Sequence, residues 1–319
     1  LGSDTGGSIR SPASFCSVVG LKPTYGAVSR FGLVSYSNSL EQIGPIARDI
    51  QSCALFMDCI GGHDIRDSTS NNKVPEQFTD SFEETPKNLK IGIPNEFFGE
   101  GIQEEVQKSV WNVVHKLEGL GFHYEKTNLP MVKYALPAYY IIAMSEASSN
   151  LARYDGLRYG FNVPEKNLNW NTIFSKNRRN GFGKEVRQRI MLGTYTLSAG
   201  YFDQYYLKAQ KIRTLIKQDF DKVFKKFDIL LAPSMPIIPF TMGEKLKDPL
   251  ALYMCDVNTV PANLAGIPSI SIPCGLSSGL PIGIQIMGPP FREDLLFKTG
   301  RLIEENVTID KSAGEFTNV

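Results

Sequence analysis

The sequence predicts an α/β protein built on a partly parallel β-sheet. Residues 89–93 alternate in character and stop at Pro94, which is typical of a strand. Apolar residues then recur at helical spacing from Val106 to Leu117, and residues 122–127 read as the next strand. Because a strand, a helix and a second strand in this order form a βαβ unit, parallel strands are expected.

The other elements follow from the same periodicities. Residues 1–36 are rich in Gly, Ser and Pro and are expected to form loops, short strands and tight turns. Helices are expected over 46–61, 137–158 and 201–227, and strands over 228–232, 269–273 and 280–287. The polar segment 64–88 is expected to be an exposed loop inside one domain that covers residues 1–319, rather than a linker.

Composition excludes several classes of protein. The 319 residues carry 34 Lys+Arg against 33 Asp+Glu, so the net charge of +1 argues against a chain that is the main binder of nucleic acid or of an anionic membrane. No uncharged apolar run approaches the ~18 residues of a spanning helix. The five Cys form no Cys-x2-Cys pair, which favours reduced thiols in the cytoplasm over a disulfide frame or a zinc site, and no metal site is expected.

The most unusual local sequence runs from Gly2 to Pro12. Its consecutive glycines let backbone N–H groups converge on one point, because glycine adopts positive φ without strain. Ser8 directly after such a loop would place a hydroxyl beside an anion site, the geometry that acyl transfer needs. Asp4 and Arg10 flank the loop and could fix its shape as a charge pair. An ordinary Gly/Ser turn is the alternative interpretation.

Other motifs are weaker. Residues 7–9 read Gly-Ser-Ile where a phosphate loop needs Gly-Lys-Ser or Gly-Lys-Thr. Residues 275–279 match Gly-x-Ser-x-Gly, but a nucleophile elbow needs a helix next and a strand follows here, so a turn between strands is expected. A serine nucleophile also needs a base. The three histidines are interpreted as surface or strand-edge residues: His63, His115 and His123. The base for Ser8 is therefore a Lys or lies outside this chain.

These residues resemble the amidase signature family. Its core motif is matched by Gly2–Arg10, Pro12-Ala13 and Gly20–Thr24. Further stretches, in order along nearly the whole chain, resemble the family of A subunits of the tRNA-dependent amidotransferases: Val28–Val34, Ser39–Pro45, Ser145–Arg153, Arg189–Thr194 and Pro261–Pro268. The sequence departs from that pattern at Ser17, where a glycine is expected.

The resemblance implies an amidase signature fold, a large mixed β-sheet with helices on both faces in an α/β/α sandwich. Residues 1–319 would be the C-terminal major part of this domain, with the N-terminal part missing. The family uses a Ser–cis-Ser–Lys triad, in which Ser8 matches the acyl-ester nucleophile. The bridging Ser and the Lys lie upstream in the family, so these residues alone are expected to be inactive. Lys22 belongs to a different motif and is not assigned as the base.

The resemblance also implies how substrate is bound. The N–H groups of Thr5, Gly6, Gly7 and Ser8 match the oxyanion hole. A glutamine substrate presents an α-carboxylate and an α-ammonium, which need a fork-shaped cation and a carboxylate. Arg189 matches the position that binds the carboxylate, Asp256 the one that binds the ammonium, and Tyr140 lines the same pocket. The alternatives are a solvated helix face for Arg189, a helix N-cap for Asp256 and core packing for Tyr140.

The resemblance therefore implies a cytoplasmic glutaminase subunit. It would supply ammonia to convert Glu-tRNA(Gln), Asp-tRNA(Asn) or both to the amidated forms. Its partners would be a B subunit, which binds tRNA and uses ATP and magnesium, and a small C subunit; the glutaminase itself needs no cofactor. Two alternatives stay open. One is a free-standing amidase of small or lipid amides, and the other is an inactive scaffold.

Overall fold

The computed structural model describes residues 1–73, 77–79, 86, 88–163, 168–244 and 249–307. The chain divides into two compact units. Unit 1 comprises Leu1–Gly32, Leu40–Leu136 and Arg213–Val319, and unit 2 comprises Leu33–Ser39 and Pro137–Ile212. Among the described residues, no helix has both the length and the apolar character that a membrane crossing requires.

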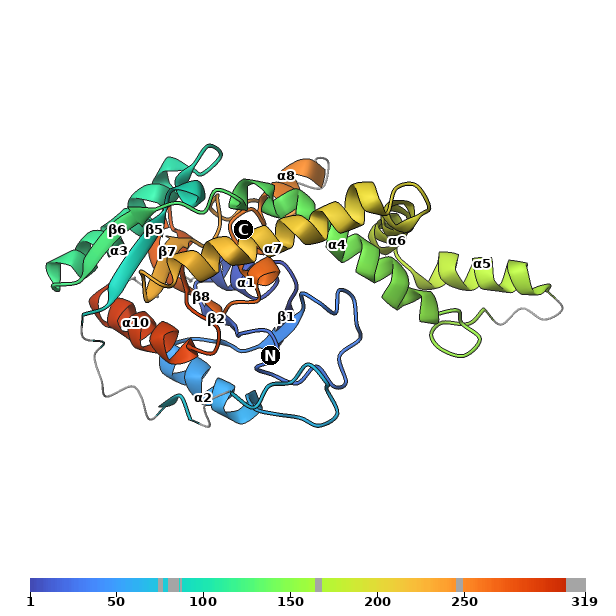
Figure 1. The fold of residues 1–319 in the computed structure, drawn as a ribbon, viewed down its shortest axis with the longest axis horizontal. Coiled ribbons are helices and arrows are strands. Elements are labelled where there is room, and N and C mark those ends of the chain that lie inside the picture. The colour runs from blue at the N-terminus through green and yellow to red at the C-terminus, as the bar shows by residue number, and fades with distance from the viewer. Residues whose placement is uncertain (74–76, 80–85, 87, 164–167, 245–248, 308–319) are drawn as a thin grey trace. The chain divides into compact units, whose positions relative to one another are not determined.

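Unit 1 contains a seven-stranded sheet in the order β4-β2-β8-β9-β7-β5-β6 (Figure 1). Its strands are β2 (Val19–Lys22), β4 (Ile46–Ala47), β5 (Lys90–Pro94), β6 (His123–Thr127), β7 (Ile229–Pro233), β8 (Ser269–Ser277) and β9 (Leu280–Met287). Strand β5 pairs in parallel with β6 and β7, and the other pairs are antiparallel. The predicted mixed sheet and the βαβ unit, with α3 (Glu104–Gly119) between β5 and β6, are confirmed.

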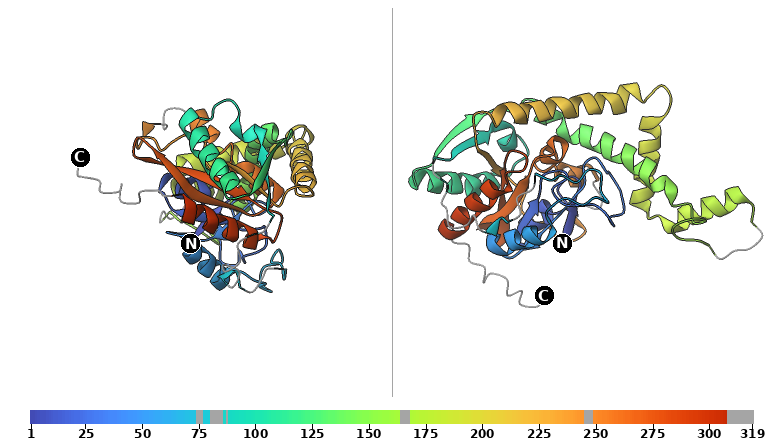
Figure 2. Two further views of the ribbon diagram at one scale, coloured as in Figure 1. Left: turned by 90° about the vertical axis from the view of Figure 1, so that its left-hand side faces the viewer. Right: turned by 60° about the horizontal axis from the view of Figure 1, so that its bottom comes forward.

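One face of this sheet is apolar. Helices α2 (Ile50–Ile60), α3 and α10 (Glu293–Asn306) lie together along it (Figures 1 and 2). We call this the apolar face, and its strand residues are Val19, Leu21, Ile91, Ile93, Ile229, Leu231, Ile270, Ile272, Ile282, Ile284 and Ile286. The packing is close at Gly300 of α10, where a Cβ atom would lie 2.6 Å from Ile50 Cδ1 and 2.8 Å from Ile272 Cδ1. The strands predicted over 89–93, 228–232, 269–273 and 280–287 therefore supply much of the hydrophobic core.

The intervening residues of β2, β8 and β9 form a face of different character. We call it the polar face, and its residues are Gly20, Lys22, Ser269, Ser271, Gly283 and Gln285, all of them buried. Helix α1 (Arg10–Phe15) packs on it, because a Cβ atom at Gly20 would lie 2.6 Å from that of Ala13. The buried hydroxyls are paired: Ser271 lies 2.7 Å from Ser234 Oγ, and Ser269 donates to Gln285 at 3.1 Å.

Some predicted elements differ from the structure. The sequence reading missed α1, whose Pro12 occupies the first turn, where a helix needs no backbone donor. Helix α4 (Ala135–Asn150) ends eight residues before the predicted 158. The cause is a turn in which Asp155 accepts the N–H groups of Leu157 and Arg158, while Gly156 has φ 76°. Regular helix α7 (Lys208–Val223) is also shorter than the predicted 201–227 and follows a π-helical turn over Asp203–Leu207.

Three further predictions concern turns and loops. Ser278 and Gly279 have φ values of 51° and 79° and form the tight turn between β8 and β9, so the Gly-x-Ser-x-Gly sequence is a hairpin and not a nucleophile elbow, as predicted. Within segment 64–88, Phe78 is buried and packs edge-on against Phe297 at 5.5 Å, so the prediction of an exposed loop is wrong at this residue. Ser17 has φ 56°, the left-handed conformation that favours the glycine expected there.

Unit 2 contains most of α4 together with α5 (Trp170–Gly181) and α6 (Lys184–Leu197). Helices α4 and α6 touch at Gly193, where a Cβ atom would overlap the carbonyl of Met144. Two hydroxyl pairs bind the helices to each other, Ser145 with Thr196 at 2.8 Å and Ser148 with Thr194 at 3.2 Å. These contacts lie close together on each helix, where α6 crosses α4 (Figure 1).

Candidate active site

The Gly/Ser loop connects strand β1 (Gly2–Asp4) to α1. Strand β1 pairs antiparallel with β3 (Gln42–Gly44), which fixes the start of the loop, and Arg10 begins the helix at its other end. Ser8 lies in the turn before α1 and is exposed. No described residue forms a hydrogen bond with its hydroxyl, so the side chain predicted as nucleophile is open to an incoming group.

Asp4 and Arg10 form a charge pair inside this loop, as the sequence predicted. Both side chains are 0% exposed, and Arg10 Nε and Nη2 each donate to the Asp4 carboxylate at 3.1 Å. The same carboxylate accepts the backbone N–H groups of Gly7 at 2.8 Å and Ile9 at 3.2 Å. Burial alone would raise the pKa of Asp4, but the charge and hydrogen bonds of Arg10 hold it below its usual value. The ionised carboxylate therefore shapes the loop around Ser8.

The charge pair is attached to α9 (Val260–Ala265), about 250 residues further along the chain. Arg10 Nη1 donates to the carbonyl of Thr259 at 2.9 Å, and Nη2 donates to Asn263 Oδ1 at 2.5 Å. Asn263 Nδ2 in turn donates to Asp4 Oδ1 at 2.9 Å. Each buried charge thus has several partners, which is the condition under which a buried ion pair is retained. The sequence reading did not identify Thr259 or Asn263, because no local pattern connects them to the loop.

Thr259 also determines the path of the loop backbone. Its hydroxyl donates to the carbonyl of Gly6 at 2.6 Å. Gly7 has φ 141°, and a Cβ atom there would overlap the Thr259 hydroxyl and lie 2.7 Å from Ser11 Oγ. Only glycine fits this position, for both conformational and steric reasons.

The predicted oxyanion donors fall into two groups. Within the described part of the chain, the N–H groups of Thr5, Gly6 and Ser8 have no hydrogen-bond acceptor. The N–H of Gly7 is different, because it already donates to Asp4. The structure therefore contradicts a free donor at Gly7, whereas an oxyanion role for the other three stays a prediction. Three unpaired donors beside an exposed hydroxyl are the arrangement that stabilises a tetrahedral oxyanion.

Asp256 lies next to this loop in unit 1. Its carbonyl accepts the N–H groups of Thr259 and Val260 at 3.1 Å, and the Thr259 hydroxyl, which donates to Gly6, lies 3.2 Å from the same carbonyl. Thr259, not Asp256, is the N-cap residue of α9, so the N-cap alternative for Asp256 is wrong. Thr259 thus connects the backbone of Asp256, the residue predicted to bind the ammonium, to the backbone of the loop that carries Ser8.

Arg189 lies on α6 in unit 2 and is not part of a solvated helix face. Its side chain is 26% exposed; Nε donates to Glu185 at 2.7 Å and Nη1 donates to the Tyr36 hydroxyl at 2.8 Å. Nη2 forms no hydrogen bond with a described residue. A guanidinium held at two nitrogens, with donors left on the third, is suited to binding a carboxylate.

Tyr140 is half-buried on α4, where its ring packs edge-on against that of Tyr139 at 4.9 Å. The role of Tyr140 in lining the glutamine pocket stays a prediction.

Lys22 lies on the polar face and has the lowered pKa that a general base needs. Burial is the main cause, and the positive charge of Arg10 adds to it, so the pKa of Lys22 falls to about 7. However, Lys22 is 1% exposed and its Nζ donates to the carbonyl of Pro23 at 2.8 Å. It forms no hydrogen bond with Ser8, which agrees with its exclusion as the base.

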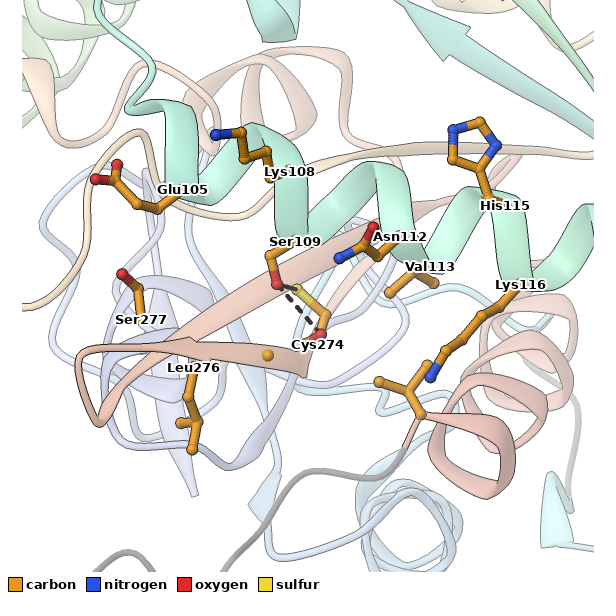
Figure 3. A pocket seen from close by; sticks show the side chains of 12 residues that line it. Glu105, Lys108, Ser109, Asn112, Val113, His115, Lys116, Cys274, Leu276 and Ser277 are labelled. Carbon is orange, nitrogen blue, oxygen red and sulfur yellow. Dashed lines mark hydrogen bonds between the residues drawn. The ribbon is translucent and has the colours of Figure 1, made fainter.

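A pocket of about 650 Å³ lies elsewhere in unit 1, between α3 and the end of β8 (Figure 3). None of the predicted site residues lines it. Ser109 points across it toward Cys274, whose carbonyl accepts the Ser109 hydroxyl at 3.3 Å (Figure 3). Burial raises the pKa of the Cys274 thiol to about 12, so the thiolate needed for nucleophilic chemistry is not populated at neutral pH.

Comparison with known proteins agrees with this arrangement. A family model described as Amidase matches residues 1–297. The chain belongs to the amidase family. The predicted amidase fold is also found in a solved relative. The chain resembles the crystal structure of the A subunit of glutamyl-tRNA(Gln) amidotransferase from Thermotoga maritima, with a TM-score of 0.79 and 40% identity. The alignment covers 98% of this chain and 63% of that one. A bacterial aryl acylamidase aligns with a TM-score of 0.75 at 25% identity, over 96% of this chain and 61% of that one.

Curated relatives are more similar in sequence. The A subunit of glutamyl-tRNA(Gln) amidotransferase from Methanosarcina mazei is 59% identical over 306 residues, which cover 96% of this chain and 64% of the relative. The protein of the same name from Moorella thermoacetica is 53% identical, over 96% of this chain and 62% of the relative. The chain therefore spans somewhat less than two thirds of the length of these relatives.

Proposed function

We propose that this chain belongs to the glutamine-hydrolysing A subunit of a tRNA-dependent amidotransferase. The observation that carries the proposal is the exposed Ser8 hydroxyl beside the unpaired N–H groups of Thr5, Gly6 and Ser8, on a loop whose shape the buried Asp4–Arg10 pair maintains. The identities of 53 to 59% to proteins named as A subunits of glutamyl-tRNA(Gln) amidotransferase support the choice of substrate.

The reaction we propose has two steps. Ser8 Oγ attacks the side-chain carboxamide carbon of glutamine, and the three N–H groups stabilise the oxyanion of the tetrahedral intermediate. Collapse of that intermediate breaks the C–N bond and releases ammonia, which takes up a proton as it leaves. Water then attacks the acyl-enzyme and releases glutamate. By the family resemblance, the Ser8 proton passes through a bridging Ser to a neutral Lys, neither of which is among residues 1–319.

Glutamine recognition would use the two charged side chains predicted for it. Arg189, with Nη2 unpaired among the described residues, would bind the α-carboxylate, and Asp256 would bind the α-ammonium. We further propose that ammonia is transferred to Glu-tRNA(Gln), Asp-tRNA(Asn) or both in a cytoplasmic complex. A B subunit would bind tRNA and use ATP and magnesium, and a small C subunit would complete the assembly.

The test uses the protein encoded by the complete gene, assembled with its B subunit, and measures glutamate released from glutamine. Ser8→Ala is expected to lower kcat by roughly a thousandfold or more, because it removes the nucleophile. Ser277→Ala is the matched control, since Ser277 lies in the β8–β9 hairpin, and it should leave turnover unchanged. Release of glutamate that is equally fast with Ser8→Ala would refute the proposal.

A free-standing amidase is the second candidate, because the aryl acylamidase shares the fold at a TM-score of 0.75. Its 25% identity is well below the 40 to 59% of the A subunits, so we favour the first candidate. A panel of glutamine, acetamide and benzamide distinguishes the two. A glutaminase should prefer glutamine strongly, since neither small amide carries the charges that Arg189 and Asp256 would bind.

A further inference from the structure

The segment Leu33–Ser39 belongs to unit 2 although about 100 residues separate it in sequence from the rest of that unit. It is attached to α4 at Tyr36 itself and at the residues that follow Tyr36. Asn150 Nδ2 donates to the carbonyl of Tyr36 at 3.1 Å, and Glu146 Oε2 accepts the Ser37 hydroxyl at 2.8 Å and the Ser39 N–H at 3.0 Å. The backbone that carries the Tyr36 ring is therefore fixed on the helix next to α6.

Tyr36 contacts Arg189 in two ways. Its hydroxyl accepts from Nη1 at 2.8 Å, and the guanidinium carbon lies 5.6 Å from the centre of its ring. Arginine has high rotamer entropy, and a planar partner with one acceptor restricts both the position and the plane of the guanidinium. The geometry leaves Nη2 unpaired among the described residues.

The second partner of Arg189 is less suited to this role. Glu185 is 54% exposed and lies four residues before Arg189 on the same helix, so it forms a surface ion pair of the kind that contributes little. Tyr36 is half-buried and, because burial raises its pKa, it stays neutral. A neutral partner orients the guanidinium and leaves its positive charge available to an incoming anion, whereas a carboxylate competes for that charge.

We propose that Tyr36 is a positioning residue that holds Arg189 in the orientation in which it binds the α-carboxylate of glutamine. This inference rests on the proposed glutaminase function. The segment Leu33–Ser39 would thereby contribute to substrate affinity, whereas Tyr36 would take no part in breaking the C–N bond.

The experiment uses the complete protein assembled with its B subunit. Tyr36→Phe keeps the ring and removes the hydroxyl, so the KM for glutamine should rise about tenfold while kcat stays within about twofold, since a hydrogen bond to a charged group is lost. Tyr159→Phe is the matched control, because Tyr159 is 60% exposed, and it should change neither constant. In a Ser8→Ala background, calorimetry should show the same tenfold rise in the Kd for glutamine.

Two further measurements separate positioning from a structural role. In an Arg189→Ala background, Tyr36→Phe should add less than about a twofold change, because residues that act through each other are not additive. For 4-aminobutanamide, which is glutamine without its α-carboxylate, Tyr36→Phe should leave KM unchanged.

The inference is overturned if Arg189→Ala raises the KM for glutamine and Tyr36→Phe does not. It is also overturned if Tyr36→Phe changes the constants for both amides equally, which would indicate a general effect on the fold. A failure of the proposed function looks different, because the unsubstituted protein would then neither hydrolyse nor bind glutamine, and the role assigned to Tyr36 would fall with it.

Discussion

The two faces of the seven-stranded sheet are built from alternate residues of the same strands, and both are buried. On β8, Ile270 and Ile272 contribute to the apolar face, whereas Ser269 and Ser271 contribute to the polar face. Stabilisation of the apolar face is non-directional and depends on volume and area. Stabilisation of the polar face depends on each group having its partner. Substitutions on the two faces should therefore differ in which properties of the protein they change, as well as in how large the changes are.

The polar face is also the one that extends to the candidate active site. Arg10 Nη1 lies 3.4 Å from Gln285 Oε1, and Gln285 Nε2 donates to the carbonyls of Pro233 and Asn258. The loop that carries Ser8 is therefore continuous with the hydrogen bonds that cover this face. Changes to the polar face should alter both stability and turnover, whereas changes to the apolar face should alter stability alone.

The largest effect is expected for Arg10→Met. It leaves the Asp4 carboxylate buried without its cation, so the free energy of unfolding should fall by about 3 to 5 kcal/mol in urea titrations. The deficit relative to the unsubstituted protein should shrink at acidic pH, because protonation of Asp4 then removes the buried charge. Arg66→Met is the control. It breaks an Arg–Asp pair of similar geometry in which Arg66 is 62% exposed, so little change is expected. Equal losses of unfolding free energy in Arg10→Met and Arg66→Met would contradict the expected difference between a buried and an exposed ion pair.

The next effect, visible in the dependence on pH, is expected for Lys22→Met. The pKa of Lys22 is about 7 in the folded protein and near its usual 10.5 in the unfolded chain. Between these values the unfolded chain binds the proton and the folded protein does not, so stability gains up to about 1.4 kcal/mol per pH unit as pH rises. Unfolding in urea between pH 7 and 10 should show this gain in the unsubstituted protein and not in Lys22→Met. Lys225→Met, which removes an exposed lysine, should retain it.

The smallest effect is expected for Ile272→Val on the apolar face. One methylene is lost beneath α10, which should lower the free energy of unfolding by about 1 kcal/mol. Turnover of glutamine by Ser8 should not change, because Ile272 lies on the opposite face from the loop. A loss of kcat without a loss of stability would show that the two faces are not independent.

The predicted strands and the Asp4–Arg10 pair could be recognised in the sequence because their signals lie within a few residues of each other. The period of two in β8 and β9 and the helical period in α3 repeat within a few residues, and Asp4 and Arg10 are only six residues apart. The early end of α4 was missed, because it depends on the turn around Asp155 rather than on periodicity.

The distant partners of the loop could not be predicted in the same way. Thr259 and Asn263 contact it across about 250 residues, and nothing in their own neighbourhood marks them as polar partners. Arg189, Asp256 and Tyr140 were assigned only through the family resemblance. The structure adds a partner for Arg189 in Tyr36 and a connection from Asp256 to the loop through Thr259. It leaves the function of all three to experiment.

The hydrogen bonds between Asn263 and Asp4 span 259 residues of chain. On a ribosome that adds about 5 to 20 residues per second, Asp4 would be added to the chain roughly 13 to 52 s before Asn263. During that interval the Gly/Ser loop lacks the partners that set the path of its backbone. A nascent chain would thus carry Ser8 on a loop whose path is not yet set, and the arrangement proposed for hydrolysis would form only when Thr259 and Asn263 reach Gly6 and Asp4.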